Sequence, residues 1–339
     1  MQPTRLPLPC LIIAEVGSVH DGSFGNARKL IDVATQCGAD AAKFQTHIAV
    51  AETLRNAPMP AYFKCEPRYE YFERTAFTKA QWQELKSYCS DNKIEFLSSP
   101  FSIEAVTLLE KIGIARYKIP SGEVSNLPLL EAIGQTGKPV LLSSGMSSWE
   151  ELDNAVTTIL RRHTSLTILQ CTSEYPCPYE EVGLNVMLEM RDRYRLPVGL
   201  SDHTLTPYAS LAAVVMGATV IERHLTFNRL MYGSDAPHSL EPGEFVDLVK
   251  GIRAIETMLA SSVDKDAVAK HLRGMKEIFE KSVVSLVDIP PGTVITACML
   301  SVKKPGTGVP ARRLNEFVGR RAAKYIFANH LVSDSDVIL

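Results

Sequence analysis

An α/β fold, a TIM (β/α)8 barrel followed by a small β-rich domain, is what this sequence predicts, and three observations support the prediction. Short apolar runs of strand length alternate with segments of helical periodicity, giving eight such pairs in the first 260 residues. The strand interiors are apolar on both faces, as in a parallel sheet covered by helices and filled inside. A length of 339 residues accommodates a barrel of about 250 residues and one appendage.

The eight expected strands follow one another along the chain. They are LIIAEVG (11–17), DAAKFQ (40–45), EFLSSPF (95–101), ARYKIPSG (115–122), PVLLSSGM (139–146), LTILQCTSEYP (166–176), PVGLSDHT (197–204) and TVIERHLT (219–226). The segments between them have helical spacing, and several end on glycine, which is a common helix stop.

Two regions depart from the barrel pattern. Residues 46–78 form a connection far longer than usual, and we expect it to act as a lid. The aromatic residues of this expected lid are Tyr62, Phe63, Tyr69 and Tyr71. After residue 260, a polar helical stretch gives way to short strands with Pro-Gly turns. The pattern therefore predicts a barrel domain at 1–260, a linker at 261–282 and a β-rich domain at 283–339.

Composition excludes several classes of protein. A hydrophobic share of 45% and a charged share of 22% are typical of a soluble globular chain, and no apolar run approaches the ~20 residues of a membrane span. The N-terminus lacks a signal-peptide cleavage site, so we expect a cytoplasmic protein. Seven cysteines without a C-x-x-C pair argue against a disulfide framework and a structural zinc site. A net charge of -2 with dispersed basic residues argues against a nucleic-acid partner.

Polar side chains gather at the C-terminal ends of the expected strands, where the catalytic residues of TIM barrels lie. One such residue alone can equally cap a helix or face solvent, but nearly all eight strands contribute here. We therefore expect a functional site at this end of the barrel. The candidates are Glu15, Lys43, Ser98, Ser99, Lys118, Ser121, Glu123, Ser143, Ser144, Ser173, Tyr175, Ser201, Asp202, His203 and His224.

The cationic and hydroxyl residues among them predict an anionic ligand. Lys43 and Lys118 would be costly to place in a barrel mouth without an anionic partner. Serines in IPSGE, LLSSGM and GLSDH can donate hydrogen bonds to phosphate oxygens. A phosphorylated anionic ligand would satisfy both sets of residues.

The histidines and carboxylates extend this prediction to a reaction. His203 and His224 end strands that are one βα unit apart, which favours a divalent metal site with open positions over two unrelated core histidines. Glu15, Glu123 and Asp235 are candidates for proton transfer or for binding substrate hydroxyls. An anion, a metal and acid-base groups together predict a carbon-carbon bond reaction on a phosphorylated substrate.

Six motifs, in order along the chain, resemble those of the sialic acid synthase family. They are IIAEVGSVHDGSFGNARKLIDVATQCGADAAKFQT, YKIPSGE, LLSSGM, CTSEYPCPYEEV, GLSDHT and GATVIERHLT. In addition, KKPGTGVPARRLNEFVGRRA resembles the family's C-terminal antifreeze-like (SAF) domain. The resemblance implies a synthase that condenses phosphoenolpyruvate with an N-acyl mannosamine-type sugar, giving a nine-carbon nonulosonic acid and phosphate.

The resemblance also implies a role for each matching residue. His203 and His224 would bind a divalent metal, Mn2+ or Mg2+, that also holds the aldehyde oxygen of the sugar. Glu123 would orient or deprotonate the water that adds before phosphate leaves by C-O cleavage. The residues implied for phosphoenolpyruvate are Lys43, Lys118, Ser121, Ser143, Ser173 and Ser201, and those implied for the sugar are Glu15, Tyr175 and Asp235.

The resemblance further implies a domain-swapped homodimer. In the family, an arginine of the antifreeze-like domain reaches the active site of the other subunit. The best-matching position in this chain is Lys304, which cannot make the bidentate contacts of an arginine. Arg312 or Arg313 is the alternative.

Departures from the family pattern bear on the sugar. Ser173 stands where sialic acid synthases have asparagine, as in the legionaminic acid and spore-coat branches. The first loop reads Val19-His20-Asp21-Gly22 in place of N-H-N-G, which changes the charge beside the sugar. We expect either an N-acetylneuraminate synthase or a legionaminic acid synthase.

Two alternatives to a phosphoenolpyruvate-dependent synthase stay open from the residues alone. One is a Schiff-base aldolase in which Lys43 or Lys118 is the nucleophile. The other is a sugar-binding relative that has lost catalysis. Cys171, which no motif pairs with a histidine, is expected to be a buried packing residue in either case.

Overall fold

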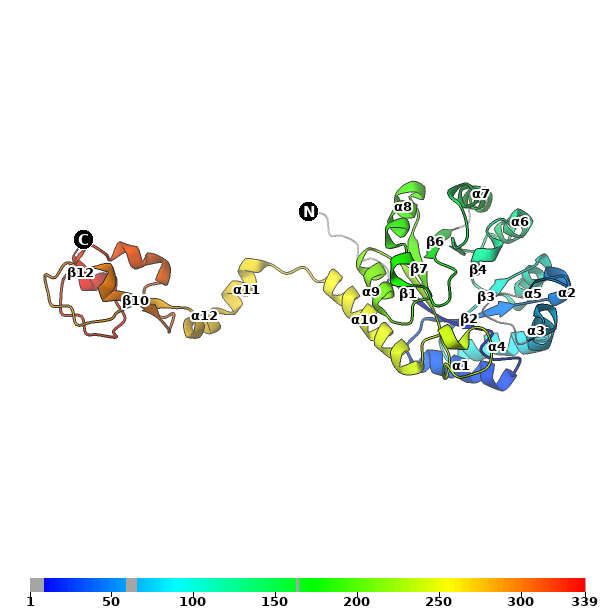
Figure 1. The fold of residues 1–339 in the computed structure, drawn as a ribbon, viewed down its shortest axis with the longest axis horizontal. Helices are drawn as coiled ribbons and strands as arrows, with labels where there is room; N and C mark the ends of the chain where they lie inside the picture. The colour runs from blue at the N-terminus through cyan, green and yellow to red at the C-terminus, as the bar shows by residue number, and fades with distance from the viewer. Residues whose placement is uncertain (1–8, 59–65, 163–164, 339) are drawn as a thin grey trace. The chain divides into compact units, whose positions relative to one another are not determined.

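The structure is a computed structural model that describes residues 9–58, 66–162 and 165–338. Its internal contacts divide the chain into two units, Met1–Ser261 and Ser262–Leu339. Figure 1 shows the first unit with its strands surrounded by helices, and the second with short strands and turns.

The first unit is the predicted α/β barrel of eight parallel strands. In the hydrogen-bonded sheet the strand order is β3-β2-β1-β8-β7-β6-β5-β4, and β3 also lies beside β4, so the barrel is nearly closed. The strands are β1 (Leu11–Gly17), β2 (Ala41–Thr46), β3 (Glu95–Pro100), β4 (Tyr117–Ile119), β5 (Val140–Ser143), β6 (Leu166–Cys171), β7 (Val198–Asp202) and β8 (Val220–His224). The predicted TIM barrel is confirmed.

Helices cover the outside of the barrel (Figure 1). Their first turns are fixed by local signals, such as the capping boxes of Thr78 with Gln81 and of Ser148 with Glu151. The helices of this unit are α1 (Phe24–Gln36), α2 (Ala49–Glu52), α3 (Arg68–Thr75), α4 (Lys79–Asp91), α5 (Ile103–Ile112), α6 (Leu127–Gln135), α7 (Trp149–Leu160), α8 (Leu184–Tyr194), α9 (Tyr208–Val215) and α10 (Pro242–Ala260). Two of them, α2 and α3, occupy the long connection between β2 and β3.

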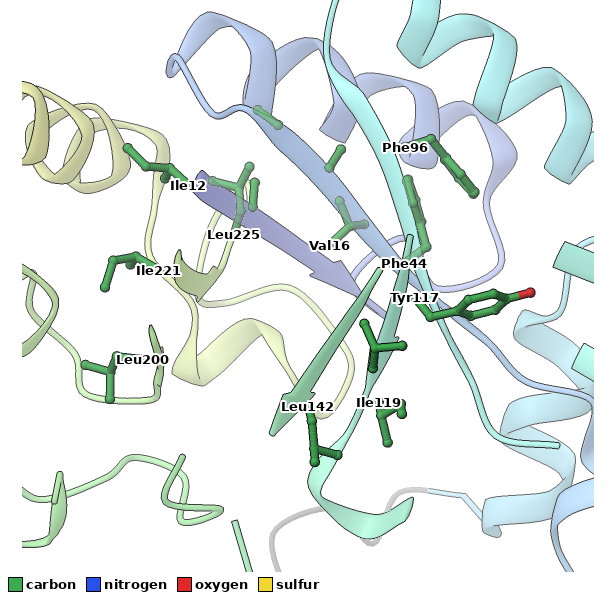
Figure 2. Close-up of a cluster of buried hydrophobic side chains, with 14 of the residues drawn as sticks. Ile12, Val16, Phe44, Phe96, Tyr117, Ile119, Leu142, Leu200, Ile221 and Leu225 are labelled. Atoms are coloured by element: carbon green, nitrogen blue, oxygen red, sulfur yellow. The ribbon is translucent and has the colours of Figure 1, made fainter. Parts of the chain in front are cut away.

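The barrel has an outer and an inner apolar layer. The outer layer packs between strands and helices, and Figure 2 shows part of it, including Ile12, Phe44 and Leu142. The inner layer fills the barrel with one buried side chain from each of six strands: Ile13, Ala41, Leu97, Leu141, Leu169 and Val220. Because side chains alternate along a strand, the residue two positions after each inner-layer residue faces the same way.

The second unit folds around its own core. It begins with α11 (Lys265–His271) and α12 (Arg273–Phe279), whose residues are exposed. Two antiparallel pairs follow, β9 (Ser282–Ser285) with β10 (Leu300–Lys303), and β11 (Arg321–Ala322) with β12 (Val337–Ile338). Its core contains Val283, Ile289, Leu300, Phe317 and Ile326. In the part of the chain that the structure describes, no helix is long and apolar enough to cross a membrane.

Candidate active site

A polar layer lies directly above the inner apolar layer. The residues two positions further along the same six strands are Glu15, Lys43, Ser99, Ser143, Cys171 and Glu222. All six are buried, and Lys118 and Ser201 from β4 and β7 lie with them. The alternation of the strands therefore delivers the acids, lysines and hydroxyls to one level of the barrel, toward the C-terminal ends.

Two lysines and two carboxylates form a buried ionic cluster in this layer. Lys43 Nζ lies 2.7 Å from Glu15 Oε2 and 3.7 Å from Glu222 Oε2. Lys118 Nζ donates to Glu222 Oε1 at 2.9 Å, and Ser201 Oγ donates to the same oxygen at 3.0 Å. The expected need of the lysines for an anionic partner is thus met by the protein itself, because Glu222 stands between them.

The charges in the cluster shift the pKa values of Glu222 and Lys43 toward their ionised forms, but not that of Glu15. Burial raises the pKa of Glu222, but the ammonium groups of Lys118 and Lys43 outweigh burial and lower it to about 2. Burial lowers the pKa of Lys43, but the carboxylates of Glu15 and Glu222 outweigh burial and raise it. For Glu15, burial is the largest influence and raises the pKa. Lys43 is therefore an ammonium, and Glu15 is the carboxylate of the cluster that takes up a proton more readily.

A hollow lined by short polar side chains opens beside this cluster, around Gly145. A Cβ at Gly145 would come within 2.4 Å of Ser173 Oγ, 2.6 Å of Ser121 Oγ and 3.2 Å of Cys171 Sγ. The absence of a side chain at Gly145 therefore allows these side chains to pack against its Cα. Nearby, the buried Ser143 Oγ has no hydrogen-bond partner within the described ranges, so it is available to a ligand.

The two predicted histidines end adjacent strands and lie close together. Their ring centroids are 5.6 Å apart. His203 Nδ1 lies 2.8 Å from the carbonyl oxygen of Thr172, which can only accept, so Nδ1 carries a proton and Nε2 is the nitrogen left to bind a metal. His224 Nδ1 is buried without a partner among the residues placed in the structure. Burial lowers the pKa of His224 to about 4, so this ring is neutral at pH 7.

Neutral imidazoles with free ring nitrogens are suitable ligands for a divalent metal. Over residues 9–58, 66–162 and 165–338, no group of three or more His, Cys, Asp or Glu is arranged to hold a metal. The two histidines fit a metal site only if substrate atoms or water complete the coordination, which is the open type of site that the sequence predicts.

The third carboxylate expected from the sequence, Asp235, lies close to β1. Asp235 Oδ2 accepts hydrogen bonds from the backbone N and from Oγ of Ser18, both at 2.9 Å. Burial raises its pKa, but His224 and these hydrogen bonds outweigh burial and lower it, so Asp235 is ionised. Gly17 has a φ of +53°, and a Cβ there would lie 2.3 Å from Asp235 Oδ2, so only glycine permits this approach.

Most of these groups line one cavity of about 440 Å3. Eleven residues assigned to the site from the sequence line it: Glu15, Lys43, Lys118, Ser121, Ser143, Ser173, Tyr175, Ser201, His203, His224 and Asp235. The Tyr175 ring lies 4.2 Å from that of His203, centroid to centroid. The strand-end pattern therefore brings together residues from seven of the eight strands or the loops that follow them.

Two predicted site residues are not in the cavity lining that the structure describes. Glu123 lies in the single-turn helix Ser121–Glu123, where its Oε2 accepts a hydrogen bond from Asn126 at 2.7 Å. Burial raises the pKa of Glu123. Lys304 belongs to the second unit, where its Nζ lies 4.9 Å from the ring centroid of Phe279.

Three polar strand-end residues face the helices rather than the cavity. Ser98 Oγ bonds Thr46 Oγ1 at 2.7 Å, and Ser144 Oγ donates to Gln170 at 3.2 Å. Asp202 forms a buried ion pair with Arg223, its partner on β8. Each lies one position from an inward-facing residue of its strand, Ser99, Ser143 or Ser201, so the alternation of the strand turns it outward. Their expected place in the site is therefore wrong.

The expected lid is only partly within the described residues. Tyr62 and Phe63 lie outside them. Tyr71 of α3 lines the cavity, whereas Tyr69 is buried beneath the guanidinium of Arg55, 4.2 Å from its ring centroid.

Sequence reasoning missed several residues that line the cavity: Gln45, His47, Arg68, Phe72, Phe101 and Glu222. Glu222 could have been found, because it precedes His224 by two positions on the same strand and so faces the same way. Gln45 could have been found by the same rule from Lys43. Cys171 is buried, as expected, but it also lines the cavity, with its Sγ 4.0 Å from His203 Nδ1.

Two known protein families match most of the chain. Residues 30–264 match the NeuB family, and residues 280–338 match the SAF domain. The chain belongs to the NeuB family. Its relatives include the N,N'-diacetyllegionaminic acid synthase of Campylobacter jejuni, which is 36% identical over 96% of this chain and 99% of the relative. The human N-acetylneuraminate-9-phosphate synthase is 35% identical over 92% of this chain and 88% of the relative.

Solved structures agree with this assignment. The N-acetylneuraminic acid synthetase of Leptospira borgpetersenii, in complex with citrate, superimposes with a TM-score of 0.69 and 29% identity, covering 79% of this chain and 92% of that one. The spore coat polysaccharide biosynthesis protein of Bacillus subtilis gives 0.66 and 26%, covering 100% and 99%. Like the named synthases of its family, the protein is an enzyme of the transferase type.

Proposed function

We propose that this NeuB-family enzyme condenses phosphoenolpyruvate with an N-acyl mannosamine-type sugar, releasing phosphate and a nine-carbon 2-keto sugar acid. The observation that carries the proposal is the single cavity in which the buried ionic cluster, the polar hollow at Gly145 and the two histidines meet. The cluster and hollow suit an anionic phosphate ester. The histidines and the remaining carboxylates suit a sugar aldehyde.

Phosphoenolpyruvate would bind to the lysine and serine side of the cavity. Lys43 and Lys118 supply two fixed ammonium groups, and Ser143 Oγ supplies a buried donor that lacks a partner in the described chain. Ser121 and Ser173 line the hollow beside Gly145, and their hydroxyls can hold these positions only because that residue has no side chain. Ser201, already bonded to Glu222, completes the set.

The two histidines would hold a divalent ion, Mn2+ or Mg2+. When bound, the ion would act as a Lewis acid on the aldehyde of the open-chain sugar. His203 is oriented for this role by its Nδ1-H bond to Thr172, because that bond leaves Nε2 as the coordinating nitrogen. His224 is kept neutral by burial and so keeps a lone pair for the ion at pH 7.

Glu15, Tyr175 and Asp235 would face the sugar. The methylene carbon of phosphoenolpyruvate would attack the aldehyde carbon, leaving cationic character on its central carbon. Water would add there, and the tetrahedral intermediate would lose phosphate by cleavage of the C-O bond. We assign the proton of that water to Glu15 rather than Glu123, because Glu15 lines the cavity and burial raises its pKa.

The sugar we propose is a 2,4-diacylated 6-deoxy mannose, the precursor of a legionaminic acid, rather than N-acetylmannosamine. Three observations support it. A relative of nearly equal length and 36% identity is an N,N'-diacetyllegionaminic acid synthase. Ser173 replaces the asparagine of sialic acid synthases. Phe72, Phe101 and Met146 line the cavity. A deoxygenated carbon of the sugar can lie against them, whereas a hydroxyl there would be buried without a hydrogen-bond partner.

We also propose a domain-swapped homodimer. Helices α11 and α12 support it, because they expose apolar side chains that a second copy would cover: Val268, Leu272, Met275, Ile278 and Phe279. The basic residue that would reach the other subunit's site is Lys304 or Arg312, both exposed. Arg313 is already engaged by Asp334 at 2.7 Å and by Glu316 at 2.8 Å.

Phosphate release from phosphoenolpyruvate tests the proposal. The enzyme is given N-acetylmannosamine, its 6-phosphate, and 2,4-diacetamido-2,4,6-trideoxymannose, each with Mn2+ and with EDTA. Metal-dependent turnover of the diacetamido sugar is expected. Phosphate release that persists in EDTA would contradict the metal assignment, whereas no phosphate release together with borohydride trapping of a lysine-pyruvate adduct would favour a Schiff-base aldolase. The raised pKa of Lys43 argues against that alternative, because a Schiff-base lysine must lose its proton to attack.

A further inference from the structure

A buried histidine that the proposed reaction does not use lies at the edge of the cavity. His47 follows β2 and is sandwiched between two phenyl rings. The ring of Phe72, from α3, is 3.8 Å away, centroid to centroid, at an interplanar angle of 7°. The ring of Phe101, just after β3, is 4.1 Å away at 23°. Both faces of the imidazole are therefore covered, and only its edge atoms are available for polar contacts.

The orientation of the Gln45 amide determines whether one ring nitrogen of His47, Nε2, donates or accepts a hydrogen bond. Gln45 Nε2 donates to Glu15 Oε1 at 2.8 Å, and the other oxygen of Glu15 faces Lys43 Nζ at 2.7 Å. Because the paired carboxylate accepts, the NH2 of the amide must face it and Gln45 Oε1 must face away. That oxygen lies 3.1 Å from His47 Nε2. His47 Nε2 must therefore carry a proton and donate it.

The carboxylate of Glu52, the last residue of α2, determines the same for the other ring nitrogen, Nδ1. Glu52 Oε1 lies 2.7 Å from His47 Nδ1, and Glu52 Oε2 accepts from the backbone N of Ile48 at 3.2 Å. Glu52 acts as an acceptor through both oxygens, so His47 Nδ1 must also donate. An imidazole that donates from both nitrogens is a cation. The phenyl faces above and below suit a cation, because an aromatic face carries partial negative charge.

We propose that His47 is a positioning residue of the active site: a buried imidazolium that, held by Glu52, locks the Gln45 amide and thereby the Glu15 carboxylate opposite Lys43. The proposal rests on the function proposed above only in assigning Glu15 to the reaction. If His47 loses a proton, one of its two hydrogen bonds is lost. The Gln45 amide can then turn and present its oxygen to Glu15, which repels it.

The charged groups around His47 are consistent with an imidazolium. Glu52 on α2 and, through Gln45, Glu15 on β1 are the carboxylates that face it. Arg68 on α3 is separated from it by the Phe72 ring, with its guanidinium 5.3 Å from that ring's centroid. The neighbouring imidazole, His20, adds no charge, because burial lowers its pKa to about 4.

Nitrogen NMR of the full-length protein with 15N-labelled histidine tests the protonation state directly. At neutral pH the His47 ring should show two protonated nitrogens, and the assignment comes from the signals lost in His47→Phe. Glu52→Gln removes the carboxylate that His47 Nδ1 faces, so one of the two protonated-nitrogen signals should be lost at neutral pH. A non-protonated ring nitrogen at neutral pH in the wild-type protein would overturn the proposal. This readout does not depend on which sugar, if any, the enzyme turns over.

Kinetics test the positioning role. His47→Phe keeps the aromatic stack but removes both hydrogen bonds, so kcat should fall about tenfold while the KM for phosphoenolpyruvate and the affinity for Mn2+ stay unchanged. His330→Phe, at an exposed position of the second unit outside α11 and α12, is the matched control and should behave as wild type. If His47→Phe is misfolded by circular dichroism, Glu52→Gln serves for the kinetics; unchanged kcat in a folded variant would refute positioning.

Discussion

Adding a methyl group at Gly145 is the sharpest test of where phosphoenolpyruvate binds, because it displaces the two serine hydroxyls assigned to that ligand. In Gly145→Ala, the new methyl group would lie 2.4 Å from Ser173 Oγ and 2.6 Å from Ser121 Oγ, distances that require both hydroxyls to move. The φ of Gly145 is not in the left-handed region, so alanine is not excluded by the backbone. Because serine hydroxyls can rotate away, the fold should survive, but the two donors leave their positions.

The magnitude follows from those two donors. A hydrogen bond to a charged group contributes about 1.5 kcal/mol or more, so losing two weakens binding by about 3 kcal/mol. Since about 1.4 kcal/mol corresponds to a factor of ten, kcat/KM for phosphoenolpyruvate should fall about a hundredfold. Phosphate release is measured against phosphoenolpyruvate concentration at saturating sugar and Mn2+. Isothermal titration with phosphoenolpyruvate alone should show the same loss.

Gly122→Ala is the matched control for this variant. Gly122 lines the same cavity, but a Cβ there would meet no described atom within 4 Å. Its KM for phosphoenolpyruvate should stay within about twofold of wild type, since no hydrogen-bond donor moves. If Gly145→Ala also keeps a wild-type KM in a protein that melts normally, the hollow does not receive phosphoenolpyruvate and the assignment of Ser121 and Ser173 is wrong.

Three further predictions address the charge cluster, the metal and the bond that breaks. Glu222→Gln leaves Lys118 and Lys43 without their shared carboxylate, which should lower the free energy of unfolding by about 3 to 5 kcal/mol in urea titrations. His203→Ala and His224→Ala should each abolish turnover and Mn2+ binding seen by electron paramagnetic resonance, while circular dichroism stays unchanged; retained binding in either would contradict the metal assignment. With 18O in the bridging ester oxygen of phosphoenolpyruvate, the label should appear in phosphate; label in the sugar acid would mean P-O cleavage.

The barrel and much of its site follow from the sequence because strand alternation and strand ends are local properties. Lys43, Ser143 and His224 could be assigned to the cavity once their strands were located, since each has the parity of an inner-layer residue. The same rule places Glu222, two positions before His224, in the cavity. Glu222 stands beside Arg223 in "VIERH", which reads as an exposed pair of opposite charges, although both side chains are buried on opposite faces of one strand.

Other features of the site depend on tertiary geometry that no local pattern encodes. Glu123 follows Pro120, after which the chain leaves the strand, so strand parity says nothing about its side chain. The contacts of His47 come from Phe72 and Phe101, which only the folding of the long connection brings together. The alternation of side chains therefore predicts which way a residue faces within a strand, but not in the loop that follows the strand.

The pairing of two lysines with two carboxylates suits the proposed reaction better than it suits the binding of a phosphate ester alone. A site that only had to bind a phosphate ester would be better served by unpaired lysines, because Glu15 and Glu222 cancel their charge. The proposed condensation, however, develops positive character on the central carbon of phosphoenolpyruvate while negative charge remains on its carboxylate and phosphate. Because the carboxylates and ammonium groups of the cluster are held in place, they can stabilise the cationic carbon and the anionic groups of the substrate without rearranging. On this reasoning Glu222→Gln, which leaves the lysines with an excess positive charge, should lower kcat without raising the KM for phosphoenolpyruvate; a raised KM with unchanged kcat would show that the carboxylate serves binding alone.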